Sequence, residues 1–233
     1  MKNRLLIFDA GPIISLTMNN LLWLIEPLQK QFRGGFFITE AVHHELVDRP
    51  FRTKRYKFEA LQLQQYVNSG VIKIIDDEKM HYKALELIET ANKCFAAKGR
   101  PINIVHYAEM STLAAALLNN AEAVAIDERT TRELIERPEQ IPKYMARRLH
   151  TNVISDNARL KSIKAALKGI KVIRSVELVT VAYELGLLDR YIKGERQLKN
   201  PKEELLDSVL WGMKLDGCAV SKKEIGQIIK MER

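Results

Sequence analysis

A chain of 233 residues can bury a substantial core, and 46% apolar with 28% charged residues exclude a disordered or fibrous protein. Its two cysteines, Cys94 and Cys218, are too few and too far apart for a disulfide framework or a cysteine metal centre. The net charge is +8 and no uncharged apolar run approaches the length of a membrane span, so we expect a soluble, cytoplasmic protein without membrane contact.

The first predicted element is a buried strand over 5–8, "LLIF", which ends at Asp9. Lys2 and Arg4 before this run imitate a signal peptide, but Asp9 interrupts the run and no small-residue cleavage site follows. Pro12 suits the first turn of the helix that comes next. An ionised carboxylate at the end of a buried strand is costly without a partner, so Asp9 needs an explanation.

Short apolar runs alternate with longer helical patterns along the rest of the chain. Strands are predicted at 5–8, 35–39, 71–75, 123–126 and 170–173, with a weaker one at 152–155. Helices are predicted at 12–31, 40–47, 55–68, 78–97, 106–119, 129–136, 157–168, 176–185, 202–214 and 222–231. This alternation predicts an α/β protein, a three-layer α/β/α sandwich with a central, mainly parallel sheet. Right-handed crossovers then place every strand-to-helix turn at one edge of the sheet.

The chain contains no internal repeat and no flexible linker. We predict one main domain over 1–193, with an insertion at about 136–155 that contains two prolines. Residues 194–233 are predicted to form a C-terminal helical hairpin packed on the same domain. The hairpin turns at "DG" (216–217), and "SKKE" (221–224) is typical of a capping box at the start of its second helix.

Positive charge is concentrated in two segments. Between Lys143 and Arg174, nine Lys or Arg residues stand against one acid, Asp156. The segment "RPFRTKRYKF" (49–58) interleaves five basic residues with three aromatic ones. Basic side chains can bind the phosphates of a single-stranded nucleic acid, and neighbouring aromatic rings can stack on its bases. Either segment alone could equally be a solvated surface, but the two together favour a polyanionic partner.

Four carboxylates are predicted to gather at the carboxyl edge of the sheet, where open α/β sheets bind ligands. Asp9 and Asp127 each follow a strand. Glu45 lies on the helix after the second strand, and Glu109 lies in the first turn of the helix before the Asp127 strand. Acids placed this closely repel each other and have raised pKa values unless cations intervene. Oxygen ligands alone favour a hard divalent cation, Mg²⁺ or Mn²⁺.

Each of these acids also has a structural interpretation. Asp9 and Asp127 could cap the following helices, Glu109 could stabilise a helix N-terminus electrostatically, and Glu45 could be a solvated surface residue. Asp156 competes with Asp127 because it also lies between a strand-like run and a helix. We prefer Asp127, which lies only 18 residues after Glu109, and we interpret Asp156 as a turn or capping residue.

Other polar residues near the acids carry weaker signals. His43, His44 and His106 lack a closing set of Cys or His ligands, so we interpret them as surface or packing residues rather than zinc ligands. Thr39 and Ser111 could donate hydrogen bonds to carboxylates or phosphate.

Four segments are similar, in this order, to the successive blocks of PIN domains: "LLIFDAGPIISL", "FFITEAVHHELV", "AEMSTLAAALLNNAEAVAIDERTTRELIE" and "GIKVIRSVELVTVAYELGLL". The resemblance covers residues 3–135 and 169–190, and the final hairpin resembles the helical ending of some members. It implies a metal-dependent ribonuclease, as in VapC-type toxins and RNA-processing enzymes. The acidic residues of the family fall on Asp9, Glu45, Glu109 and Asp127.

We therefore predict that these four acids catalyse the hydrolysis of single-stranded RNA through water activated by Mg²⁺ or Mn²⁺. Asp9, Glu109 and Asp127 are the predicted metal ligands. The predicted RNA contacts are Arg52, Lys54, Arg55, Arg129 and Arg132, although the last two could also simply decorate a helix. Further predicted partners are a second copy of the chain, through the apolar faces of 12–31 and 55–68, and an antitoxin-like inhibitory protein.

Three other functions were weighed against this one. A non-catalytic RNA-binding or assembly module with the same fold is the main alternative, and the presence of all four acids argues against it. A phosphatase of the haloacid dehalogenase type normally has a second acid two residues after the first, where this chain has Gly11. A dinucleotide-binding Rossmann protein would have a glycine-rich turn, but only "DAGP" follows the first strand.

Overall fold

A computed structural model describes residues 4–232 of the chain. Five parallel strands form the central sheet in the order β3-β2-β1-β6-β8, with the first strand in the middle. The strands are β1 (Leu5–Phe8), β2 (Gly35–Thr39), β3 (Ile72–Ile75), β6 (Ala123–Ala125) and β8 (Val172–Ile173). The predicted parallel sheet is confirmed, and the predicted strand-end acids lie on neighbouring strands, because β1 pairs with β6.

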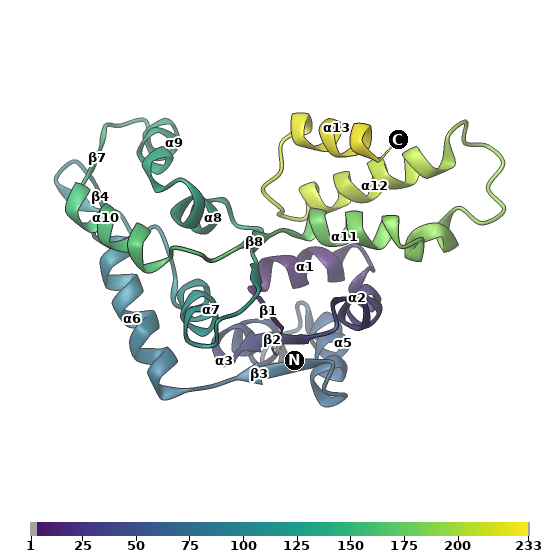
Figure 1. Cartoon of the computed structure of the whole chain (residues 1–233), viewed down its shortest axis with the longest axis horizontal. Coiled ribbons are helices and arrows are strands. Elements are labelled where there is room, and N and C mark those ends of the chain that lie inside the picture. Colours follow the sequence, from purple (N-terminus) through teal and green to yellow (C-terminus); the bar gives the residue numbers. More distant parts are fainter. Residues whose placement is uncertain (1–3, 233) are drawn as a thin grey trace.

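Helices cover both faces of the sheet (Figure 1). The helices that matter for the site are α1 (Ala10–Met18), α2 (Ile25–Phe32), α3 (Glu40–His43), α5 (Lys57–Asn68), α6 (Glu78–Asn92), α7 (Tyr107–Leu118), α8 (Arg129–Glu136) and α11 (Ser175–Glu184). Within residues 4–232, no helix combines the length and apolar character that a membrane span requires.

The two layers of helices meet alternate side chains of each strand. Leu6 and Phe8 of β1 belong to a core that includes residues of α1, α2, α5 and α11. Ile7, between them, belongs to a second core with residues of α6 and α7 on the other face. Figure 1 shows α1 and α11 on one side of the sheet and α6 and α7 on the other. This period of two is the expected pattern of a strand buried on both faces, so the predicted three-layer α/β/α sandwich is confirmed.

One predicted helix is broken in the structure. The prediction of a single helix over 12–31 is wrong, because α1 ends at Met18 and α2 begins at Ile25 after a short 3-10 turn, Leu22–Leu24. Asn20 has a φ of 56°, a left-handed conformation that ends a helix and that asparagine tolerates. Pro27 then falls in the first turn of α2, where its missing N–H costs no hydrogen bond.

A second, small sheet was not predicted. The predicted helix over 78–97 ends at Asn92, and its last residues form β4 (Phe95–Ala97). This strand pairs antiparallel with β5 (Arg100–Pro101) and with β7 (Val153–Ser155). The weak strand predicted at 152–155 therefore exists, but it belongs to this small sheet and not to the central one.

The two regions predicted as additions to the main domain are mostly helical. Residues 136–155 contain a 3-10 turn, Pro138–Gln140, then α9 (Ile141–Leu149) and β7, followed by α10 (Asn157–Ala166). The C-terminal hairpin consists of α12 (Pro201–Leu215) and α13 (Lys222–Met231). Its apolar side chains join the core that also contains α1 and α11, and Ser221 with Glu224 forms the predicted capping box.

Candidate active site

Asp9 ends the central strand β1 and lies at the N-cap position of α1, with 5% of its surface exposed. Its side chain makes no capping hydrogen bond of normal geometry, and the N–H groups of Ala10 and Gly11 in the first turn of α1 stabilise its charge less than burial destabilises it. Burial raises the pKa of Asp9 to about 7, and repulsion by Glu109 and Glu45 adds to the rise, while the backbone N–H groups of Ala10 and Gly11 oppose it. The structure therefore brings three of the four predicted acids into one electrostatic neighbourhood.

Glu109 lies in the first turn of α7 and is half-buried. Its carboxylate accepts a hydrogen bond of 2.8 Å from the backbone N–H of His106, which makes a capping box at the start of the helix. Burial raises the pKa of Glu109 to about 7, and the nearby carboxylates of Glu128 and Glu45 add to the rise. Two carboxyl groups with pKa values near 7 at one sheet edge are typical of a functional site.

Asp127 lies at the predicted edge, but its carboxylate has other partners. Oδ2 accepts a hydrogen bond of 2.7 Å from the Ser15 hydroxyl of α1, and Oδ1 accepts one of 2.7 Å from the backbone N–H of Ser175 in α11. The Asp127 backbone carbonyl also accepts a hydrogen bond from the N–H of Ala219, after α12. Asp127 thus joins the end of β6 to two helices and to the C-terminal segment, and its role as a metal ligand stays a prediction.

The alternation of side chains along β6 explains why the Asp127 carboxylate contacts α1 and α11. Val124 and Ile126 face the core of α6 and α7, whereas Ala125 between them faces the core of α1 and α11. Continuing the alternation places Asp127 toward α1 and α11, and the next residue, Glu128, toward α7. The same reasoning places Asp9 on the α7 side, because Phe8 before it faces α1.

Glu128 is the acid that the sequence analysis missed. It is half-buried, caps α8 by accepting a hydrogen bond of 2.6 Å from the Thr131 N–H, and raises the pKa of Glu109 by charge repulsion. The doublet "DE" after the strand "AVAI" was the available signal, since consecutive residues at a strand end point to opposite faces.

Glu45 borders the group of acids from the exposed side. It lies in a π-helical turn, His44–Asp48, that follows α3, and it lines two hollows at the protein surface. One hollow of about 710 Å³ lies between α1, the 45–63 segment and the turn after α12. The other, of about 920 Å³, is lined by Asp76, Asp77 and His81 among others. Glu45 therefore faces open space at the protein surface, whereas Asp9, Glu109 and Glu128 line neither hollow.

The predicted RNA contacts divide into two groups. Arg52, Lys54 and Arg55 are exposed in the segment before α5, and Arg55 lines the 710 Å³ hollow. Its guanidinium lies over the Tyr56 ring, 4.6 Å from the centroid, so a cation and an aromatic face are presented together.

The other two arginines have partners within the protein. Arg129 is exposed and lies over the Tyr144 ring, 4.8 Å from the centroid. Arg132 is buried and donates a hydrogen bond of 3.2 Å to the carbonyl of Ala219. These contacts give Arg132 a structural role, and they lend no support to its predicted contact with phosphate.

The remaining candidates have structural explanations. Asp156 is exposed and caps α10, accepting hydrogen bonds of 3.0 and 3.1 Å from the N–H groups of Ala158 and Arg159. The hydroxyls of Thr39 and Ser111, both buried, form a hydrogen bond of 2.7 Å that joins β2 to α7. The capping interpretation of Asp156 is thereby confirmed.

The acidic residues offer the type of ligand atom that a hard divalent cation prefers, but no three of them, among the residues that the structure describes, place carboxylate oxygens within 4.8 Å of one another. The ligand atoms offered by Asp9, Glu109, Glu45 and Glu128 are all carboxylate oxygens, which Mg²⁺ and Mn²⁺ prefer. The two pKa values near 7 express mainly the cost of burying each charge, and repulsion between the carboxylates adds to that cost. A bound divalent ion would offset this cost.

The hydrogen bonds of Asp127 predict that this residue stabilises the folded protein. Asp127→Ala leaves the Ser15 hydroxyl and the Ser175 N–H without a partner, and we expect it to lower the free energy of unfolding by about 3 kcal/mol. The matched control Asp156→Ala removes only an exposed cap and should lower the free energy of unfolding much less. Urea unfolding in EDTA measures both. An Asp127→Ala protein as stable as the wild type would contradict the structural role.

Comparison with known proteins gives one result. A family model described as a PIN domain matches residues 5–140, which is more than half of the chain and includes Asp9, Glu45, Glu109, Asp127 and Glu128. Neither the curated proteins nor the solved structures compared with the chain gave a significant match.

Proposed function

The chain belongs to the PIN-domain family, and on this premise we propose that it is a metal-dependent endoribonuclease that hydrolyses single-stranded RNA. PIN domains are generally nucleases, and the site here has the chemistry that such a reaction needs. The observation that carries the proposal is the buried Asp9 carboxylate at the end of β1, which has no capping hydrogen bond of normal geometry and a pKa raised to about 7 beside Glu109.

Within this proposal, Asp9 and Glu109 hold the ion, with Glu45 and Glu128 at its border and Asp127 as the further predicted ligand. A bound Mg²⁺ or Mn²⁺ supplies an activated water and offsets negative charge on the phosphate. The protein's own part is to fix the acids. The His106 N–H holds Glu109, the Thr131 N–H holds Glu128, and the hydrogen bonds of Asp127 hold α1 and α11 against the end of β6.

The 710 Å³ hollow supports a path for single-stranded RNA. Arg49 and Arg55 line it together with Tyr56 and Glu45. Phosphates can pair with the arginines while a base stacks on the Tyr56 ring, and the strand then reaches the acids at Glu45. Recognition by charge and stacking alone gives little sequence preference, so we propose binding of single strands by shape and charge.

Neutralising the basic segment tests this path. The triple substitution of Arg52, Lys54 and Arg55 by Gln removes up to three phosphate contacts, so we expect RNA binding to weaken at least about tenfold. The slope of log affinity against log salt should fall by about 0.7 for each lost contact. Fluorescence anisotropy with a labelled single strand at several salt concentrations measures both.

A matched control keeps the change in net charge the same. Lys193, Arg196 and Lys199 are exposed in the loop before α12, and their replacement by Gln should leave both affinity and salt slope close to those of the wild type. Equal losses in the two triple variants would mean that net charge, and not the proposed path, attracts the RNA.

Cleavage itself is tested by metal removal and return. The purified protein should cut single-stranded RNA with Mg²⁺ or Mn²⁺, stop in EDTA and resume when the ion is added in excess. The alternative function, a non-catalytic RNA-binding or assembly module, requires RNA binding with no cutting under any divalent ion.

Two partners stay predictions. Phe58 and Leu61 on α5 and Ile14 on α1 are exposed apolar side chains, as the predicted homodimer requires. An antitoxin-like inhibitor would have to cover the acids or the hollow that Glu45 lines.

A further inference from the structure

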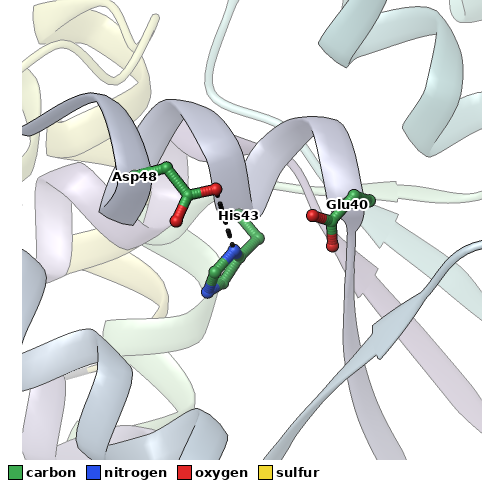
Figure 2. Close-up of side chains that lie close together, drawn as sticks. All are labelled: Glu40, His43 and Asp48. Atoms are coloured by element: carbon green, nitrogen blue, oxygen red, sulfur yellow. Dashed lines mark ion pairs between the residues drawn. The ribbon is translucent and has the colours of Figure 1, made fainter.

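A second group of metal-binding side chains lies on the helical segment that follows β2. Glu40 and His43 belong to α3, and Asp48 ends the π-helical turn His44–Asp48 (Figure 2). Each of the three offers one ligand atom that lies within 4.8 Å of the other two. The acids of the candidate active site do not contribute to this group.

The π-helical turn explains why these residues meet. In an α-helix, a residue five positions after His43 would lie on a different face, since one turn takes 3.6 residues. The wider π-turn closes hydrogen bonds over five residues, which brings Asp48 to the same side as His43. Such turns inside helices occur frequently at functional sites.

The His43 ring is fixed by a neighbour outside the group. Gln64 on α5 donates from Nε2 to Oδ1 of Asn68 at 2.7 Å, so its Oε1 is left to face the Nε2 of His43 at 3.0 Å. The imidazole Nε2 therefore carries the hydrogen and donates it to Gln64. Histidines that bind metals usually donate their other ring N–H to an oxygen in this way.

The other ring nitrogen is the atom that needs a partner. The His43 side chain is only 12% exposed, and its Nδ1 is buried without a hydrogen bond among the described residues. The Asp48 Oδ2 lies 3.7 Å from Nδ1, too far for a hydrogen bond. Two ligands that each bind one zinc ion at about 2.1 Å lie about 3.4 Å apart at a tetrahedral angle, close to this separation.

We propose that Glu40, His43 and Asp48 form a second metal site, selective for a divalent transition ion such as Zn²⁺. One imidazole and two carboxylates suit Zn²⁺ better than Mg²⁺, which prefers oxygen ligands only. Three protein ligands leave a further position for water. The site revises our interpretation of His43 as a surface or packing residue.

The test uses the full-length protein carrying Asp9→Asn, so that the candidate active site binds metal weakly and the result does not depend on nuclease activity. Titration of the metal-free protein with Zn²⁺ should show one saturable site, measured by calorimetry. Co²⁺ bound in the same place should give visible absorption bands. Millimolar Mg²⁺ should leave the Zn²⁺ site unaffected.

Two substitutions and one control locate the site. His43→Gln and Asp48→Asn should each weaken Zn²⁺ binding about 100-fold or more, since each removes a ligand; Asp48 is 37% exposed in its side chain, so its variant is expected to fold. His44→Gln changes the exposed neighbouring histidine and should leave binding unchanged. Absence of saturable binding, or equal losses in the His43 and His44 variants, would overturn the proposal and leave an ordinary His–Asp ion pair.

Discussion

Asp9→Asn is expected to abolish RNA cleavage and, without metal, to make the protein more stable than the wild type. The side chain keeps its size but loses the anionic ligand, so we expect the rate of cutting to fall at least about 100-fold. The gain in stability follows from the pKa of Asp9, which burial raises from 3.8 to about 7. At pH 8 the buried charge then costs on the order of 4 kcal/mol, and its removal should recover part of this free energy.

The control for Asp9→Asn is the same substitution at Asp156, an exposed cap of α10. Asparagine caps helices about as well as aspartate, so Asp156→Asn should change neither cleavage nor stability. Cleavage assays and urea unfolding in EDTA at pH 8 measure the two properties. An Asp9→Asn protein that is clearly less stable than the wild type would show that Asp9 has a structural role and not a strained, functional one.

Without metal, the wild type is expected to lose stability as the pH rises from about 4 to 7. Asp9 and Glu109 keep their protons up to about pH 7 in the folded protein, whereas the unfolded chain releases them near pH 4. Between these values the folded state binds more protons, so the free energy of unfolding falls, by at most about 1.4 kcal/mol per pH unit for each group. Above about pH 7 both states are ionised and the effect levels off.

Divalent ions should reverse this loss. Mn²⁺ binds the ionised carboxylates, so its stabilising effect should be small at pH 5 and large at pH 8. Urea unfolding at both values, with Mn²⁺ or with EDTA, measures the effect. The Asp9→Asn protein isolates the contribution of Asp9, because other titrating groups are common to both proteins. Parallel pH profiles for the two proteins would contradict the raised pKa of Asp9.

Much of the fold could be predicted from the sequence because strands buried on both faces appear as short continuous apolar runs. Runs such as "LLIF" alternate with helical patterns, and this indicates a parallel sheet whose strand ends share one edge. The break between α1 and α2 was harder to predict. The apolar pattern of 12–31 continues through it, and only Asn20 and Pro27 mark the turn.

The candidate site could be predicted only in part. Asp9 and Glu109 meet as expected because the strand order brings their elements together. The choice between Asp127 and Glu128 depends on which face of β6 each residue takes, and the hydrogen bonds from Ser15 and Ser175 that engage Asp127 come from distant segments. The Glu40, His43 and Asp48 group depends on a π-helical turn, and we found no sequence signal for that turn.

The end groups of the RNA products test the central claim most directly. Wild type and Asp9→Asn, purified side by side, are incubated with a labelled single-stranded RNA and Mn²⁺. Attack by a metal-activated water predicts fragments from the wild type without 2′,3′-cyclic phosphate, and no fragments from Asp9→Asn. Fragments that end in a cyclic phosphate, or equal cutting by both proteins, would contradict hydrolysis at Asp9.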